Sequence, residues 1–168
     1  MTCLSDERSI VGIDPTPRGL AFVFFEGDRL LDWGTSRNKI TELEALQKLL
    51  ERCKPDVLVI EDQAARRCER RPRIRALLRS IERHARRAGV NVTKIARYEV
   101  RQAWLRRGIR TKQRVAEAIS AVFPELEPLV PRPRKVFGNE EAQTQIFDAA
   151  SLVLHAFGTK SDSAAEAA

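Results

Sequence analysis

The chain is poor in residues that cross-link a fold through sulfur or bind zinc. It contains 3 cysteines and 2 histidines among 168 residues. Cys3, Cys53 and Cys68 are odd in number, and none forms a CxxC pair. A disulfide framework and a cysteine-based zinc site are therefore both disfavoured. We expect three ordinary thiols of a reducing compartment.

Long apolar stretches are also missing. No run approaches the roughly 20 apolar residues of a membrane helix, and the first residues lack the basic-then-apolar order of a signal peptide. We therefore expect a cytoplasmic protein that makes no membrane contact. The sequence shows no internal repeat. Its length suits one domain, predicted over residues 1–158, with a disordered tail at 159–168.

Positive charge is concentrated in the middle of the chain. Residues 66–114 hold 18 Lys and Arg against 3 acids, whereas the remaining residues hold 12 basic against 20 acidic side chains. An arginine-rich block suits bidentate phosphate contacts and predicts a polyanionic partner. A solvated helix surface is the alternative. The side chains expected to hold phosphates without reading sequence are Arg66, Arg67, Arg70, Arg71 and Arg73.

Apolar periodicity and capping signals predict a mixed α/β fold. The expected strands are 9–14, 20–25, 29–34, 57–61 and 90–96, and the expected helices are 41–52, 72–88, 98–106, 111–122 and 139–157. The proline-rich stretch 126–138 is expected to be a loop, not a packed element. This order predicts a mixed five-stranded sheet flanked by helices, with the first and fourth strands parallel neighbours.

Three carboxylates stand in apolar surroundings. Asp14 and Glu61 end β-branched runs, and Asp148 lies inside an apolar helical stretch. Strand ends of this kind meet at one sheet edge, where open α/β sheets bind ligands. Buried acids need positive charge, and hard cations prefer oxygen ligands, so we predict Mg²⁺ or Mn²⁺, two ions per site. Glu141 and Gln145 share a helical face with Asp148 and could add a ligand.

Each acid also has a structural interpretation that needs no metal. Asp14 precedes Pro15 and could be a turn aspartate. Glu61 could pair with the arginines that follow it, and Asp148 could be a surface or ion-paired helix residue. The joint occurrence of the three acids with the basic block favours the functional interpretation.

Several short motifs, in this order, resemble one known family. They are Ile13-Asp14-Pro15, Val59-Ile60-Glu61, Arg97-Tyr98-Glu99-Val100-Arg101-Gln102, Gly108-Ile109-Arg110-Thr111-Lys112 and Asp148-Ala149-Ala150-Ser151-Leu152. The resemblance is to RuvC-type Holliday junction resolvases of the ribonuclease H-like superfamily, and it covers residues 9–157.

The resemblance implies a ribonuclease H-like fold with Asp14, Glu61 and Asp148 as catalytic metal ligands. It implies in-line attack of a metal-activated water that leaves 5′-phosphate ends. Arg101 and Lys112 match positions where the family has basic residues that contact DNA near the scissile phosphate. The leading hypothesis is a homodimeric crossover junction endodeoxyribonuclease that nicks branched DNA, in particular four-way junctions.

Three departures from the family pattern are visible. Thr16 follows the first Asp-Pro pair where the family usually has a small residue, often glycine. Gln145 stands where the family often has another Asp or a His, which leaves open whether Gln145 or Glu141 is a fourth ligand or three carboxylates suffice. No aromatic residue follows Glu61 within residues 62–67, so either junction opening relies on arginine or the substrate preference differs.

Two other functions stay open from the sequence. One is a ribonuclease H-like nuclease that acts on RNA or an RNA–DNA hybrid. The other is a non-catalytic, structure-specific nucleic-acid binder. An actin-like phosphotransferase is disfavoured because no glycine-rich phosphate loop follows the first strand.

Overall fold

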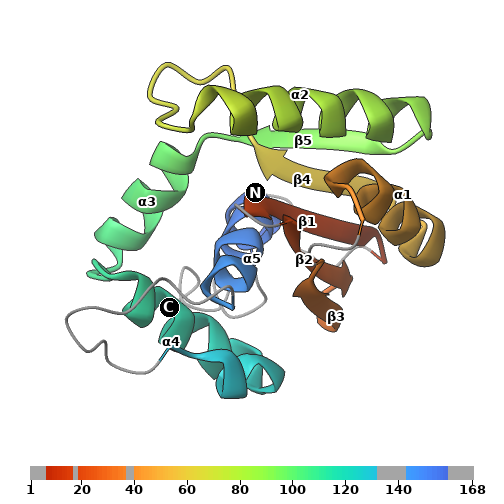
Figure 1. Cartoon of the computed structure of the whole chain (residues 1–168). Coiled ribbons are helices and arrows are strands. Elements are labelled where there is room, and N and C mark those ends of the chain that lie inside the picture. Colours follow the sequence, from red (N-terminus) through yellow and green to blue (C-terminus); the bar gives the residue numbers. More distant parts are fainter. Residues whose placement is uncertain (1–6, 17–18, 37–39, 132–142, 159–168) are drawn as a thin grey trace.

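The computed structural model describes residues 7–16, 19–36, 40–131 and 143–158 (Figure 1). A five-stranded sheet has the order β3-β2-β1-β4-β5. The antiparallel pairs are β1–β2 and β2–β3, and the parallel pairs are β1–β4 and β4–β5. The strands are β1 (Ser9–Thr16), β2 (Gly19–Glu26), β3 (Arg29–Thr35), β4 (Val57–Glu61) and β5 (Asn91–Ile95). The predicted mixed sheet is confirmed.

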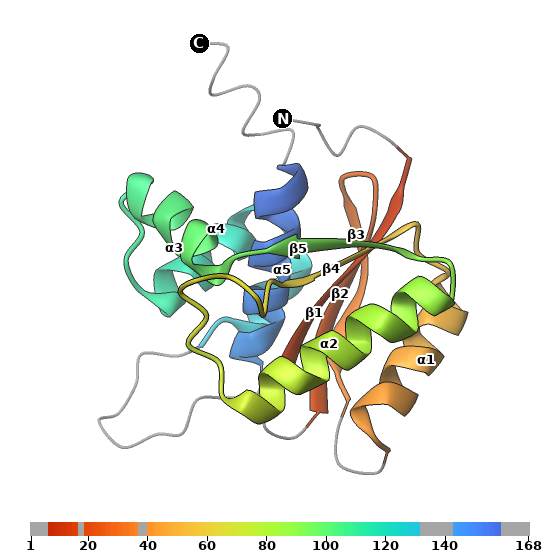
Figure 2. The ribbon, with the colours of Figure 1, turned by 90° about the horizontal axis from the view of Figure 1, so that it is seen from above.

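Helices cover both faces of the sheet. They are α1 (Glu42–Cys53), α2 (Pro72–Arg87), α3 (Arg97–Arg106), α4 (Lys112–Val122), α5 (Thr144–Phe157) and the 3₁₀ helix η1 (Pro124–Leu129). Figure 2 shows α1 and α2 on one side of the sheet and α5 on the other, with α3 and α4 beyond α5. No helix among the described residues is long and apolar enough to cross a membrane.

Local signals place the helix ends where the sequence predicts them. The Thr41 backbone N–H donates to Glu44 Oε2 at 2.7 Å, and the Glu44 N–H donates to Thr41 Oγ1 at 3.2 Å, which completes a capping box for α1. Pro72 begins α2, and Gly89 follows its end with a φ of 79°. Cys53 and Cys68 are free thiols, as expected.

The proline-rich stretch is the part of the fold that was predicted wrongly. Its first residues form η1, in which Leu126 is fully buried and packs in the core with Phe123. η1 tolerates Pro124 because the backbone N–H groups in the first turn of a helix have no acceptor within the helix, so a residue without an N–H loses no hydrogen bond there. Residues 132–138 of the predicted loop, and the predicted start of the last helix at 139, lie outside the described residues.

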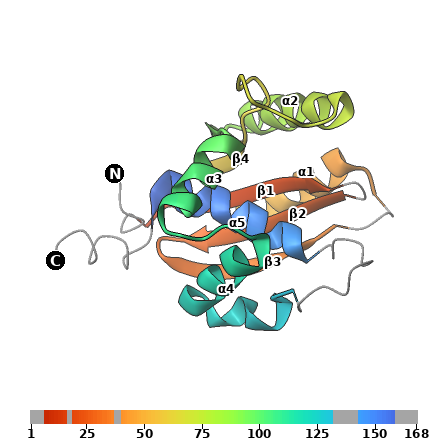
Figure 3. The ribbon, with the colours of Figure 1, turned by 90° about the vertical axis from the view of Figure 1, so that its left-hand side faces the viewer.

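Strand alternation divides the core into two halves. Ile10 and Val59 face α5, whereas Val11, Ile13 and Leu58 face α1 and α2. Figure 3 shows α5 lying across the sheet, and this helix contacts all five strands. α5 therefore packs against the full width of the sheet.

Gly12 of β1 sets how closely α5 approaches the sheet. A Cβ atom at this position would lie 2.5 Å from Val153 Cγ2 and 2.9 Å from the Ala149 carbonyl oxygen. Both atoms belong to α5, and the carbonyl is backbone that cannot rotate away. Glycine is thus required for the observed helix–strand contact.

Replacing Gly12 with alanine is expected to lower the free energy of unfolding by about 2 kcal/mol, since overpacking displaces α5 from β1. Urea denaturation followed by circular dichroism measures this loss. Gly34→Ala is the matched control, because a Cβ at Gly34 would meet only the Phe22 ring at 3.2 Å. Equal losses for the two variants would contradict the packing argument.

Candidate active site

The parallel pair β1–β4 brings two carboxylates together at one edge of the sheet. The pairing ends with Gly12 opposite Val59, and Asp14 and Glu61 each lie two residues beyond that pair on their own strands. Both residues are 1% exposed. Because side chains alternate along a strand, Asp14 lies on the same face as Gly12, the face that α5 covers. The predicted meeting of these acids at the sheet edge is confirmed.

The third acid reaches the site from α5. Asp148 follows Phe147, a buried residue that anchors this part of α5 in the core. The Asp148 side chain is 17% exposed. It is therefore the most accessible of the three carboxylates.

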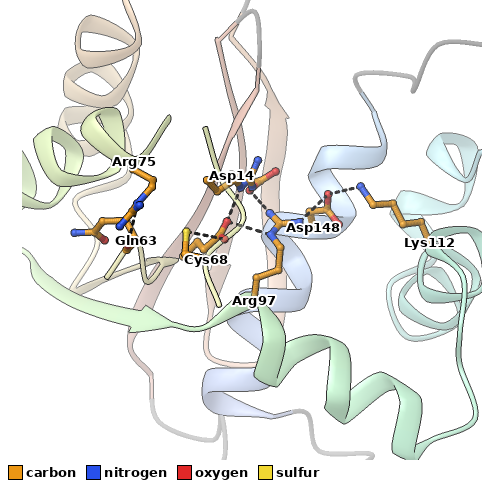
Figure 4. A network of polar contacts seen from close by, with 9 residues as sticks. Asp14, Gln63, Cys68, Arg75, Arg97, Lys112 and Asp148 are labelled. Carbon is orange, nitrogen blue, oxygen red and sulfur yellow. Dashed lines mark hydrogen bonds and ion pairs between the residues drawn. The ribbon is translucent and has the colours of Figure 1, made fainter. Parts of the chain in front are cut away.

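Arg97, the first residue of α3, contacts all three acids. Its guanidinium lies 2.6 Å from Asp14 Oδ1, 3.0 Å from Glu61 Oε2 and 3.5 Å from Asp148 Oδ2. In Figure 4 the Arg97 side chain lies between Asp14 and Asp148. One guanidinium thus joins residues from β1, β4 and α5.

A second guanidinium enters from the connection between β4 and α2. Arg70 Nε donates to Glu61 Oε2 at 2.7 Å, and its Nη2 donates to Asp14 Oδ1. This connection is itself anchored, since Arg75 Nε donates to the Gln63 carbonyl at 3.2 Å and Gln63 Nε2 donates to Glu82 at 3.2 Å. The fold therefore holds Arg70 at the acids.

Burial and charge act on Asp14 in opposite directions. Burial raises its pKa to about 6, while the guanidinium groups of Arg97 and Arg70 oppose that rise and the nearby Asp148 and Glu61 add to it. For Arg97, burial lowers the pKa, but the three carboxylates outweigh burial and leave it above its ordinary value. Arg97 is permanently charged in this setting.

The carboxylate oxygens of the site suit a hard divalent cation, but in this structure the same oxygens form ion pairs with arginine side chains. Asp14, Glu61 and Asp148 offer only carboxylate oxygens, which Mg²⁺ and Mn²⁺ prefer. Gln145, one turn before Asp148, has a buried side-chain oxygen without a hydrogen-bond partner among the described residues. As the side chains stand, no three His, Cys, Asp or Glu within the described ranges are arranged to hold one ion.

Most of the other residues predicted to bind nucleic acid lie on the surface, and one of them lies in the carboxylate site. Four of the five arginines expected to hold phosphates, Arg66, Arg67, Arg71 and Arg73, are exposed. Arg67 lies over the Tyr98 ring at 4.4 Å. Arg70 is the exception, because it binds the buried acids. Arg101 is exposed on α3, and Glu141 lies outside the described residues.

Lys112 also belongs to the site. Its Nζ lies 3.2 Å from Asp148 Oδ2, on the opposite side of that carboxylate from Arg97 in Figure 4. The resemblance to known resolvases implied a position near the scissile phosphate, and the structure places Lys112 beside the most exposed of the three acids.

Arg97 is the site residue that the sequence interpretation missed. It belongs to one of the motifs that resemble the resolvase family, but the basic block contains many arginines with similar neighbours. Strand register would have provided a signal, because Glu61 pairs with Ile95 and Arg97 follows two residues later. A residue just beyond the carboxyl end of a strand beside β4 is well placed to reach the same sheet edge.

Comparison with solved structures identifies the fold. RuvC from Thermus thermophilus has a TM-score of 0.58 at 21% identity, covering 88% of this chain and 92% of that chain. The same protein in complex with a Holliday junction substrate has a TM-score of 0.61 at 21% identity, with coverages of 88% and 91%.

The yeast mitochondrial Holliday junction resolvase Ydc2 is also similar, with a TM-score of 0.60 at 13% identity, covering 92% of this chain and 79% of that chain. No protein-family model matches the sequence, and neither does any curated protein. The chain thus has the ribonuclease H-like fold of RuvC-type resolvases, as its motifs predicted.

Replacing Arg97 with alanine is expected to lower the free energy of unfolding by about 2 kcal/mol in metal-free buffer. The loss leaves two buried carboxylates with one guanidinium, although partial exposure of Arg97 and the presence of Arg70 moderate the cost. Urea denaturation measures it. Arg101→Ala, on the exposed surface of the same helix, should change stability by less than about 0.5 kcal/mol. Similar values for both variants would refute the ion-pair assignment.

The raised pKa of Asp14 predicts a pH-dependent stability difference between wild type and Asp14→Asn. From pH 3.8 to about 6 the folded protein holds the Asp14 proton that the unfolded chain releases, so this group destabilises the wild type progressively as pH rises. We expect the stability of Asp14→Asn relative to wild type to increase over that window and to level off above it. Urea denaturation in EDTA between pH 4 and 8 tests this. A constant difference would show that the pKa is not raised.

Proposed function

We propose that this protein is a divalent-metal-dependent endonuclease that nicks branched DNA, with four-way junctions as its preferred substrate. This proposal rests mainly on the convergence of Asp14, Glu61 and Asp148 from β1, β4 and α5 at one sheet edge. This arrangement lies in a fold shared with RuvC-type resolvases, one of which was solved in complex with a Holliday junction substrate. The activity is that of a crossover junction endodeoxyribonuclease.

The three carboxylates are the groups that would hold Mg²⁺ or Mn²⁺, and Gln145 is a candidate for a further contact. Two ions per site remain our expectation. A bound divalent ion would activate water and stabilise negative charge on the phosphate. For the carboxylate oxygens to become available, Arg97 and Arg70 must release them. The same guanidinium groups are then free to bind a phosphate, which they suit geometrically.

Positive side chains outside the carboxylate cluster would hold the rest of the DNA. Arg66, Arg67, Arg71 and Arg73 form an exposed group at the beginning of α2 and the connection before it. Contacts of this kind position a duplex without reading its sequence. A homodimer would place two such sites on the two strands of a symmetric junction, as the resemblance implies.

A non-catalytic, structure-specific binder is the second candidate. It is favoured by the ion pairs that engage all three acids and by the lack of a ready-made metal group among the described side chains. In this alternative the arginines neutralise the acids permanently, and the protein binds DNA without cutting it.

Cleavage assays separate substrates and test the three acids. We expect wild type with Mg²⁺ or Mn²⁺ to nick four-way junctions in preference to linear duplex, RNA–DNA hybrid and structured RNA. Asp14→Asn, Glu61→Gln and Asp148→Asn should each reduce cleavage at least about a hundred-fold, since each replaces a carboxylate that would hold the divalent ion with a neutral amide. Asp62→Asn, next to Glu61 but outside the network, is the control and should retain activity. Undiminished cleavage by Asp14→Asn would eliminate the proposed site.

Calorimetric titration with Mn²⁺ distinguishes the nuclease from the binder without measuring activity. We expect saturable binding to wild type, loss of that binding in Asp14→Asn, and tighter binding to Arg97→Ala, because the competing guanidinium is gone. No saturable binding to either wild type or Arg97→Ala would favour the non-catalytic binder.

A further inference from the structure

A pocket of about 350 Å³ lies beside the carboxylate site, between α3, α4 and α5. This volume is within the range of small-ligand pockets. Trp104 and Leu105 of α3, Val115 of α4 and Phe147 of α5 form part of its wall. Asp148 also lines the pocket, so the pocket and the carboxylate site share a residue.

The pocket combines an apolar interior with a cationic rim. Its charged lining residues other than Asp148 are all basic, and they are Arg97, Arg101, Arg110 and Lys112. Two of these, Arg97 and Lys112, also bind Asp148. An uncharged apolar ligand would make no use of the basic side chains at the rim. A flat aromatic group joined to a phosphate could place its ring in the apolar interior and its phosphate at the basic rim.

Two further features favour a nucleobase as that aromatic group. Trp104 offers an indole, and the Arg107 guanidinium lies 5.0 Å from the centroid of its ring. Bases stack on aromatic side chains largely irrespective of sequence. Ser151, also in the lining, is 4% exposed, and its Oγ has no hydrogen-bond partner among the described residues. A hydroxyl in this situation can bond to a polar atom of a base.

We propose that this pocket receives an unpaired nucleobase from the strand whose phosphate lies at Asp14, Glu61 and Asp148. The inference rests on the proposed function and extends it, because it says how the strand is held next to the scissile phosphate. Bases at a branch point cost less to unstack than bases inside a duplex. A base pocket beside the acids would therefore favour branched over linear DNA.

The test is a double-mutant cycle between the protein and the DNA. Four-way junctions carry an abasic nucleotide at each position flanking the branch point in turn, and binding is measured by fluorescence anisotropy in EDTA to prevent cleavage. At one position we expect wild type to bind the intact junction about ten-fold more tightly than the abasic one, the scale of one base–aromatic stack. Trp104→Leu, which keeps an apolar side chain, should bind both junctions equally.

Two matched variants control for structural damage. Trp104→Phe keeps an aromatic ring and should restore most of the discrimination. Tyr98→Leu removes an exposed aromatic residue of the same helix that does not line the pocket, and it should discriminate as wild type does. As a second measurement, 2-aminopurine at the sensitive position should be quenched by wild type and brighter with Trp104→Leu.

Several outcomes would overturn the proposal. The abasic substitution could weaken binding equally in wild type and Trp104→Leu, or at no position. Trp104→Leu could instead change the sedimentation of the free protein without any base dependence, which would assign the pocket to a contact between two copies. Equal binding of junction and linear duplex by wild type would contradict the proposed function. The same cycle on a duplex with one unpaired base then tests the pocket by itself.

Discussion

Asp14 and Glu61 are buried as a pair, and two shared guanidinium groups make that burial possible. Ionised carboxylates removed from water cost several kcal/mol each unless nearby positive charge compensates. Arg70 and Arg97 each bond to both acids, and they come from segments far apart in the sequence. The connection before α2 and the start of α3 are consequently held against the sheet edge by the acids themselves. A substitution at any one of these positions therefore changes the ion pairs of the others.

The positions of Asp14 and Glu61 could be predicted from the sequence pattern of their strands. A β-branched run that ends in an acid predicts both a buried strand and a polar residue at its rim, and β1 and β4 have this pattern. Since the strand period is 2, one correct pairing, Gly12 with Val59, puts Asp14 and Glu61 on the same face and the same end of the two strands. Asp148 was predictable as a polar residue within an apolar helical stretch. The sheet order and most element bounds follow from the same periodicities.

The arginines could not be assigned in the same way. Eighteen basic residues fall within residues 66–114, and local pattern does not distinguish a guanidinium that enters the site from one that faces solvent. Arg70 was predicted to face DNA, yet the Gln63–Arg75 and Gln63–Glu82 contacts shape its connection so that it reaches the acids. Leu126 was missed for a related reason. The proline-rich sequence around Leu126 predicts an exposed loop, and only the tertiary structure shows that Leu126 packs in the core.

Charge balance connects the acids to the DNA that they are proposed to cut. Among the described residues, the charged side chains of this network are three acids and three bases, namely Asp14, Glu61, Asp148, Arg70, Arg97 and Lys112. This cluster is balanced by itself, so an approaching phosphate adds a negative charge that the cluster does not compensate. Arg101 and Arg110 on the pocket rim supply part of the missing positive charge, and a divalent ion among the acids would supply the rest. A phosphate at the acids and a cation between them should therefore stabilise each other, which makes DNA binding and metal binding thermodynamically coupled.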